Sequence, residues 1–133
     1  MRKLFILTTF ISSLMMSSIA HAEWTKVTEN DTGDSSYVDF ERIRKHNGKV
    51  YFWRMSDYLK PTEHGVLSGK IYHEAECGRF RLRYLNDTYY KGPMASGEVF
   101  GSINIPQIDW TYPSPNSEFE DILKAVCNHK SMQ

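Results

Sequence analysis

The sequence has no net charge and, beyond its first 22 residues, no long apolar run. Its 16 lysines and arginines balance 16 aspartates and glutamates. A chain without an overall field does not attract nucleic acid or an anionic membrane, so we expect neither as a partner. No later segment reaches the roughly 20 apolar residues that a membrane helix needs. We therefore expect a protein that is not embedded in a membrane.

The sequence also lacks a recognisable catalytic or metal-binding motif. His73-Glu74 resembles the start of a zinc-protease helix motif, but the second histidine is missing. Ser68 has no glycine two places before it, so it does not fit a nucleophile elbow. The two cysteines, Cys77 and Cys127, lack the C-x-x-C spacing of redox enzymes. These absences predict a protein that is not an enzyme and that holds no metal and no cofactor.

The first 22 residues have the pattern of a secretory signal peptide. Arg2 and Lys3 precede an apolar stretch over residues 4–19, and Ala20-His21-Ala22 supplies small residues for cleavage before Glu23. The alternative is a membrane anchor, for which the stretch is short. No cysteine stands near the cleavage point, so we expect no lipid anchor. Residues 23–133 should form one exported domain that is either periplasmic, or secreted or associated with the cell surface.

The exported part reads as a series of strands separated by turns. Alternation predicts strands over 24–27, 35–40, 49–59, 88–91 and 98–105, with turns at 30–34 and at Asn47-Gly48. Asp39 is expected to cap one helical turn over 40–44. Rings occur at both parities of 49–59, which indicates a central strand that is partly covered on both sides. Three prolines make 106–116 an irregular crossing.

Residues 69–85 alternate as a strand does, but the alternation slips in the middle. Ile71, His73, Ala75 and Cys77 share the parity expected to face the core. After Cys77 the apolar residues change parity. A bulge at Gly78 within one long strand repairs the slip, and we favour this interpretation. The alternative is a tight turn at Cys77-Gly78 that joins two strands.

The C-terminal segment has the pattern of an amphipathic helix. Its apolar stripe consists of Phe119, Ile122, Leu123, Val126 and Cys127. Ser117 followed by Glu120 fits a capping box that satisfies free backbone N–H groups. Both cysteines thus face the core, each from its own element, in a chain expected to reach an oxidising compartment. We predict a Cys77–Cys127 disulfide between the helix and the sheet.

Arginine alternates along the second half of the 69–85 stretch and suggests a partner-binding surface. One interpretation, which we favour, is a solvated face that balances the neighbouring glutamates. The other is a cationic stripe, bordered by tyrosines, that docks an acidic protein, since arginine and tyrosine are enriched in interface cores. The candidate residues are Arg79, Arg81, Arg83, Tyr89 and Tyr90.

In combination, several features resemble the surface-adhesin protein E family of Gram-negative bacteria. They are Trp24, Tyr37-Val38-Asp39, Ile43-Arg44 before Asn47-Gly48, the segment VYFWRMSDY over 50–58, Cys77, Trp110, Pro113, Ser114 and Val126-Cys127. The resemblance implies an α+β fold: a twisted antiparallel sheet with a C-terminal helix packed on it and tied to it by a disulfide. It also implies a homodimer in many members and binding of host matrix or plasma proteins such as vitronectin and laminin.

We therefore expect an exported, non-enzymatic binding protein whose partner is a protein of the host extracellular matrix or of the envelope. The alternative is a periplasmic inhibitor or accessory factor of an envelope enzyme or complex. Cell fractionation distinguishes the two, because adhesion requires surface exposure or secretion, whereas an accessory factor stays in the periplasm.

Overall fold

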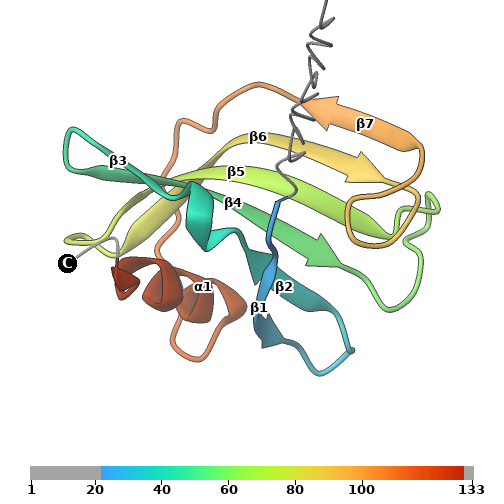
Figure 1. Cartoon of the computed structure of the whole chain (residues 1–133), viewed down its shortest axis with the longest axis horizontal. Helices are drawn as coiled ribbons and strands as arrows, with labels where there is room; N and C mark the ends of the chain where they lie inside the picture. Colours follow the sequence, from blue (N-terminus) through green and yellow to red (C-terminus); the bar gives the residue numbers. More distant parts are fainter. Residues whose placement is uncertain (1–21, 131–133) are drawn as a thin grey trace, which may run out of the picture.

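Strands that are neighbours in the sheet are mostly neighbours in the chain. The computed structural model describes residues 22–130 (Figure 1). The sheet order is β1-β2-β4-β5-β6-β7, with β3 pairing beside β2 on β4, and all pairings are antiparallel. The strands are β1 (Thr25–Glu29), β2 (Ser35–Val38), β3 (Arg44–His46), β4 (Lys49–Asp57), β5 (Ser68–Glu76), β6 (Arg81–Tyr90) and β7 (Val99–Ile103). The α+β fold class predicted from the sequence is confirmed.

Two local signals form as predicted around β3 and β4. Asn47 and Gly48 both have positive φ, 50° and 75°, and make the two-residue turn between these strands. Asp39 caps a short 3-10 helix, η1 (Phe40–Arg42), by accepting a hydrogen bond from the backbone N–H of Glu41. The helical turn is shorter than the predicted 40–44 because Ile43 is already extended.

The favoured interpretation of residues 69–85 as one bulged strand is wrong, and the alternative turn is correct. β5 ends at Glu76 and β6 begins at Arg81, with a hydrogen bond from the N–H of Phe80 to the carbonyl of Cys77. Phe80, not the glycine, has the positive φ, 49°. The hairpin lets the two strands pair along their whole length and sets glutamates opposite arginines across the ladder. In a single bulged strand, these two segments could not pair with each other and the glutamates would not lie opposite the arginines.

A bulge lies further along, within β6. His73 pairs with Tyr84 and Tyr72 pairs with Asn86, so Leu85 is the extra residue. The sequence pattern predicted separate stretches of strand over 69–85 and 88–91, with Asn86-Asp87 between them. The strand instead continues to Tyr90, and the bulge moves every later side chain to the opposite face.

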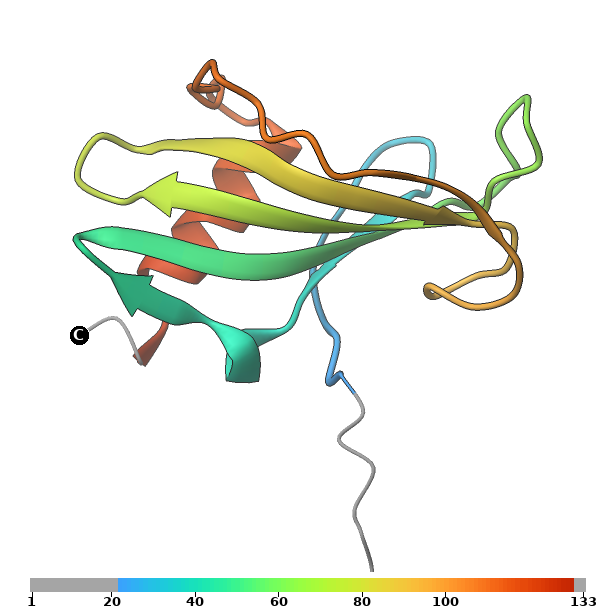
Figure 2. The same cartoon turned by 90° about the horizontal axis from the view of Figure 1, so that it is seen from above.

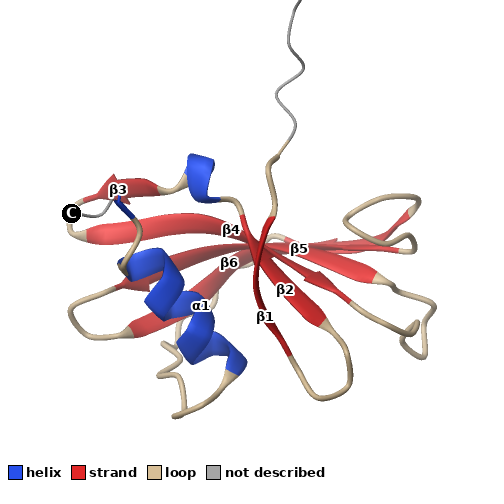
Figure 3. Cartoon of the chain, turned by 60° about the horizontal axis from the view of Figure 1, so that its bottom comes forward, coloured by secondary structure: helices blue, strands red, loops and turns tan. Residues whose placement is uncertain are grey.

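The helix α1 (Glu118–Cys127) packs across one face of the sheet, as Figures 2 and 3 show. Ser117 is its N-cap and accepts from the N–H of Glu120, whose carboxylate accepts from the N–H of Asn116. The capping box therefore forms, although its second bond reaches one residue further back than usual. The core is made by Val38, Val50, Phe52, Ala75, Leu82, Ile122, Leu123 and Val126.

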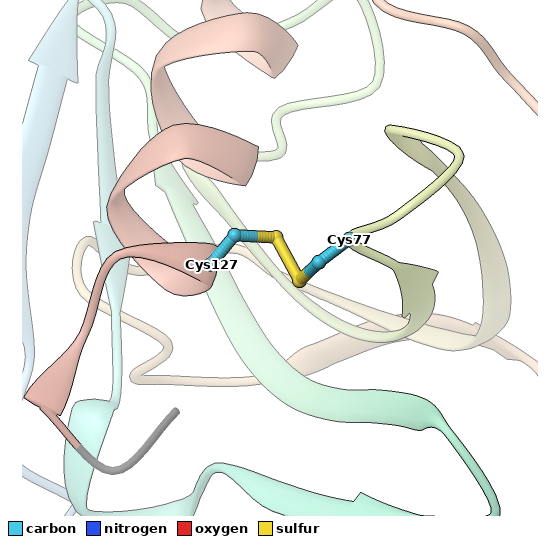
Figure 4. The surroundings of a disulfide bond; sticks show 2 residues. All are labelled: Cys77 and Cys127. Carbon is cyan, nitrogen blue, oxygen red and sulfur yellow. A yellow bond between two sulfur atoms is a disulfide. The ribbon is translucent and has the colours of Figure 1, made fainter. Parts of the chain in front are cut away.

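The predicted disulfide joins Cys127, at the end of α1, to Cys77, directly after β5 (Figure 4). Their Cα atoms are 5.7 Å apart. The predicted signal peptide falls almost entirely outside the described residues, so its cleavage before Glu23 stays a prediction. Within 22–130, no helix has the length and apolar character of a membrane span.

Candidate protein-binding face

The sheet carries different side chains on its two faces. In β4, Val50, Phe52 and Arg54 lie on the face that α1 covers, whereas Tyr51 and Trp53 point away from it. The side chains pointing away form what we call the outer face. It consists of Tyr51, Trp53, Lys70, Tyr72, Glu74, Arg81 and Arg83.

The centre of the outer face is a stack of aromatic rings and a cation. Trp53 and Tyr72 are direct cross-strand partners, and their ring centroids are 4.7 Å apart. The Nζ atom of Lys70 lies 4.4 Å from the Trp53 ring, a cation–π contact. Arg42 and Arg44 join Trp53 and Tyr72 around a hollow of about 400 Å³. Burial lowers the pKa of Lys70, and the positive charge of Arg42 lowers it further by a smaller amount.

A second cluster lies at one end of the outer face, beneath Trp110. This ring comes from the irregular crossing, which bridges to β6 through Thr111 and Leu82. The guanidinium carbons of Arg81 and Arg83 lie 4.2 and 4.4 Å from its centroid. Trp110 therefore covers part of the arginine row.

The remaining charge of the arginine row is largely balanced by two glutamates. Arg81 hydrogen-bonds to Glu76 at 3.0 Å, and Arg83 hydrogen-bonds to Glu74 at 3.2 Å. The hydrogen bond from Arg81 lowers the pKa of Glu76. Arg79 lies in the turn, with 70% of its side chain exposed and a longer contact of 3.6 Å to Glu76. Arg81 and Arg83 thus present stacked and paired groups to solvent, not a bare cationic stripe.

The two tyrosines of the predicted surface are not brought together with the arginines. Because of the bulge at Leu85, Tyr89 lies on the helix-bearing face and donates a hydrogen bond to Asp87 at 2.7 Å. Tyr90 is on the same face as the arginines, but at the far end of β6, where it lines a hollow with Trp24 and Lys70. Whether any of the five predicted residues contacts a partner stays a prediction.

Sequence reasoning missed the residues at the centre of the outer face. The rings at both parities of 49–59 did indicate Trp53, but its stacking with Tyr72 depends on the register of β4 against β5. That register could not be predicted once residues 69–85 were interpreted as one strand, because the ends of β5 were then unknown. Trp110 has no local signal, since a chain crossing brings it to the arginines.

His73, which the alternation placed on the core-facing side of the sheet, is fully buried beneath α1. Its ring stacks on Phe52, and its Nε2 accepts a hydrogen bond from Nε of Arg54 at 3.0 Å. Nδ1 is then the donor to the carbonyl of Arg83. Burial, and secondly the charge of Arg54, place the pKa of His73 well below its ordinary value. Within the described residues, no group of three potential ligands could hold a metal ion.

The family profile of surface-adhesin protein E matches residues 24–128. The chain belongs to this family. No functionally curated protein matches the chain.

The solved structures that resemble this adhesin-E chain include several of Haemophilus influenzae protein E. Its crystal form II shares 15% identity over 81% of this chain and 89% of that one, with a TM-score of 0.61. The selenomethionine form gives 15% identity, 81% and 88% coverage and a TM-score of 0.60. Protein E from non-typeable Haemophilus influenzae shares 14% identity over 83% of this chain and 78% of that one, with a TM-score of 0.56. At these identities the likeness shows the fold alone.

Proposed function

We propose that this member of the surface-adhesin protein E family is an exported, non-enzymatic protein that binds another protein through the outer face of its sheet. The class of partner is a host matrix or plasma protein. The observation that carries the proposal is the stack of Trp53, Tyr72 and Lys70, which no helix covers within residues 22–130. Family membership supports adhesion as the purpose of the binding.

The chemistry of the stack suits recognition of a protein. Tryptophan, tyrosine and arginine carry a large share of the energy in interfaces, and they act best in hollows from which a partner excludes water. Cross-strand stacking already holds Trp53 and Tyr72 in place, so binding orders few side chains. Lys70 and Arg44 border the stack with positive charge, which favours an acidic segment in the partner.

The test is capture of the exported protein by immobilised vitronectin, laminin and host-cell matrix, comparing the native chain with Trp53→Ala. We expect the variant to bind at least tenfold more weakly, because a central interface tryptophan commonly contributes more than about 1.4 kcal/mol. Leu59→Ala is the control, since Leu59 is apolar and 65% exposed, and its side chain lies beside Gly33 in the turn between β1 and β2. Circular dichroism checks that both variants fold.

Two outcomes would contradict the proposal. Equal binding by folded Trp53→Ala would remove the outer face as the contact surface. Strict retention in the periplasm, together with capture by envelope extract and not by matrix, would favour an inhibitor or accessory factor of an envelope complex.

A further inference from the structure

The face that bears α1 has a polar hollow that the helix does not fill. The hollow measures about 240 Å³ and lies where β2, β4 and β6 pass the start of α1. Figure 3 shows α1 crossing only part of this face. Serines and tyrosines are half of the residues that line the hollow, and the guanidinium of Arg54 lies among them although this residue is only 5% exposed. Two carboxylates also line it, Glu118 and Asp34, and Asp34 accepts a hydrogen bond from the backbone N–H of Leu59 at 2.9 Å. The hollow is on the side of the sheet away from the outer face.

Arg54 is surrounded mainly by neutral acceptors. Its Nε, Nη1 and Nη2 atoms donate to Nε2 of His73, to Oγ of Ser56 at 2.5 Å and to the hydroxyl of Tyr84 at 3.4 Å. The carboxylate nearest to it within the described residues belongs to Glu118, and it lies 3.8 Å away, beyond hydrogen-bond distance. A buried guanidinium stays charged and is best satisfied by a carboxylate in direct, two-pronged contact. An anion is the group that would complete this site.

An apolar hollow adjoins the polar one. It measures about 250 Å³, and its lining includes Val66, Phe100 and His64, whose ring stacks on that of Phe100. Tyr58 and Tyr89 line both hollows and form the shared wall. Burial raises the pKa of each of these two hydroxyls, so both remain neutral near pH 7. Because Tyr58 lines the polar hollow, its hydroxyl could donate a hydrogen bond to a ligand there.

We propose that the two hollows together bind a ligand with a carboxylate next to an apolar group. The carboxylate contacts Arg54 and the hydroxyl of Tyr58, and the apolar group contacts Phe100. The two hollows, about 240 and 250 Å³, together fall in the lower half of the usual range for small-molecule pockets and can hold an acylated amino acid. N-acylated amino acids and the C-terminal residue of a polypeptide share this chemistry.

Glu118 makes the proposal sharply testable, because its carboxylate competes with a bound anion for Arg54. Its side chain is 39% exposed, so it can turn toward solvent when the ligand enters. Replacing Glu118 by glutamine removes the repulsion and retains an acceptor for the hydroxyl of Ser36. An anionic ligand should therefore bind Glu118→Gln about three- to tenfold more tightly. A cationic ligand would bind it more weakly.

The experiment titrates the exported protein with N-acetylphenylalanine and with N-acetylphenylalanine amide, followed by amide-proton NMR shifts. We expect the acid to bind at least tenfold more tightly than the amide, with shifts in Ser56, Tyr58 and Phe100. Phe100→Ala should weaken binding of the acid. Glu41→Gln has the same change in charge on an exposed residue outside the hollows, and it should have no effect.

The outcomes separate the alternatives. Equal binding of acid and amide, or no gain from Glu118→Gln, would overturn the proposal. An octapeptide with a free C-terminal phenylalanine that binds more tightly than the acetylated amino acid would assign the site to polypeptide ends, and equal affinity would assign it to small carboxylates. Trp53→Ala should leave all of these affinities unchanged, so this site can succeed or fail independently of the outer face.

Discussion

At the scale of single residues, the environment of His73 links folding to pH. Its imidazole is buried and neutral, and it accepts a hydrogen bond from Arg54. The folded-state pKa lies well below 6.5, whereas the unfolded chain has the ordinary value. Below about pH 6.5 the unfolded state therefore binds the extra proton first, and folding loses stability as the pH falls.

We predict that the free energy of unfolding falls between pH 6.5 and pH 5 by up to about 1.4 kcal/mol per pH unit, the slope for one proton. Urea denaturation at several pH values measures this slope. His73→Gln should flatten it, because the amide oxygen can still accept from Arg54 but does not titrate in this range. An equally steep slope in the folded variant would assign the pH dependence to other groups.

The same residue shows where sequence reasoning stops. Alternation over 69–77 correctly placed His73 on the core-facing side of the sheet. Its complete burial depends on Phe119 of α1 and on Phe52 of β4, which are distant in the sequence. The Arg54 hydrogen bond likewise follows from the pairing of β4 with β5. Alternation in the sequence indicates the face of the sheet on which a side chain lies, but it does not indicate which residues pack over that side chain.

At the scale of the elements, sequence signals were reliable where a few adjacent residues determine the geometry. Asn47-Gly48, the Asp39 cap and the Ser117 cap all formed as predicted. The connection between β5 and β6 was wrongly predicted as a bulge at Gly78, because a glycine is as common in a bulge as in a turn. Pairing between Glu76 and Arg81 decided for the hairpin, and such pairing is a property of two strands together.

The N-cap of α1 gives a prediction at this scale. Ser117→Ala removes the side-chain acceptor for the N–H of Glu120 and should lower the free energy of unfolding by about 1 kcal/mol. Ser117→Asn, which can still cap, should stay within a few tenths of a kcal/mol of the native chain. Urea denaturation of the three proteins measures both differences. A loss as large in Ser117→Asn would show that the cap is not the cause.

At the scale of the whole molecule, the disulfide holds the helix to the sheet. The two cysteines are 50 positions apart, and closing a loop of that length restricts the unfolded chain by about 4 kcal/mol. That is a large part of the roughly 5–15 kcal/mol by which small domains are stable. The sequence predicted this bridge because each cysteine falls on an apolar stripe. It did not predict the depth of the hollows beside α1, which depends on packing.

Replacing both cysteines by serine should therefore lower the melting temperature by on the order of 20 °C. Thermal unfolding followed by circular dichroism measures the shift. Non-reducing peptide mapping of exported protein should yield one linked pair of peptides, with Cys77 in one and Cys127 in the other. Two free thiols, or a bridge between two chains, would contradict the prediction.

The bridge also divides the chain for any protease that reaches it. Residues 77–127 form a covalent ring that contains β6, β7, the crossing and α1. A single cut inside the ring, for example in the loop over 91–98, leaves both pieces attached through sulfur. A cut in the loop over 58–67 lies outside the ring and leaves β1 to β4 held only by non-covalent contacts. A single proteolytic cut therefore has different consequences in the two parts of the sheet. After a cut within 77–127 the two fragments stay linked by the disulfide, whereas after a cut within 58–67 the fragment with β1 to β4 can dissociate.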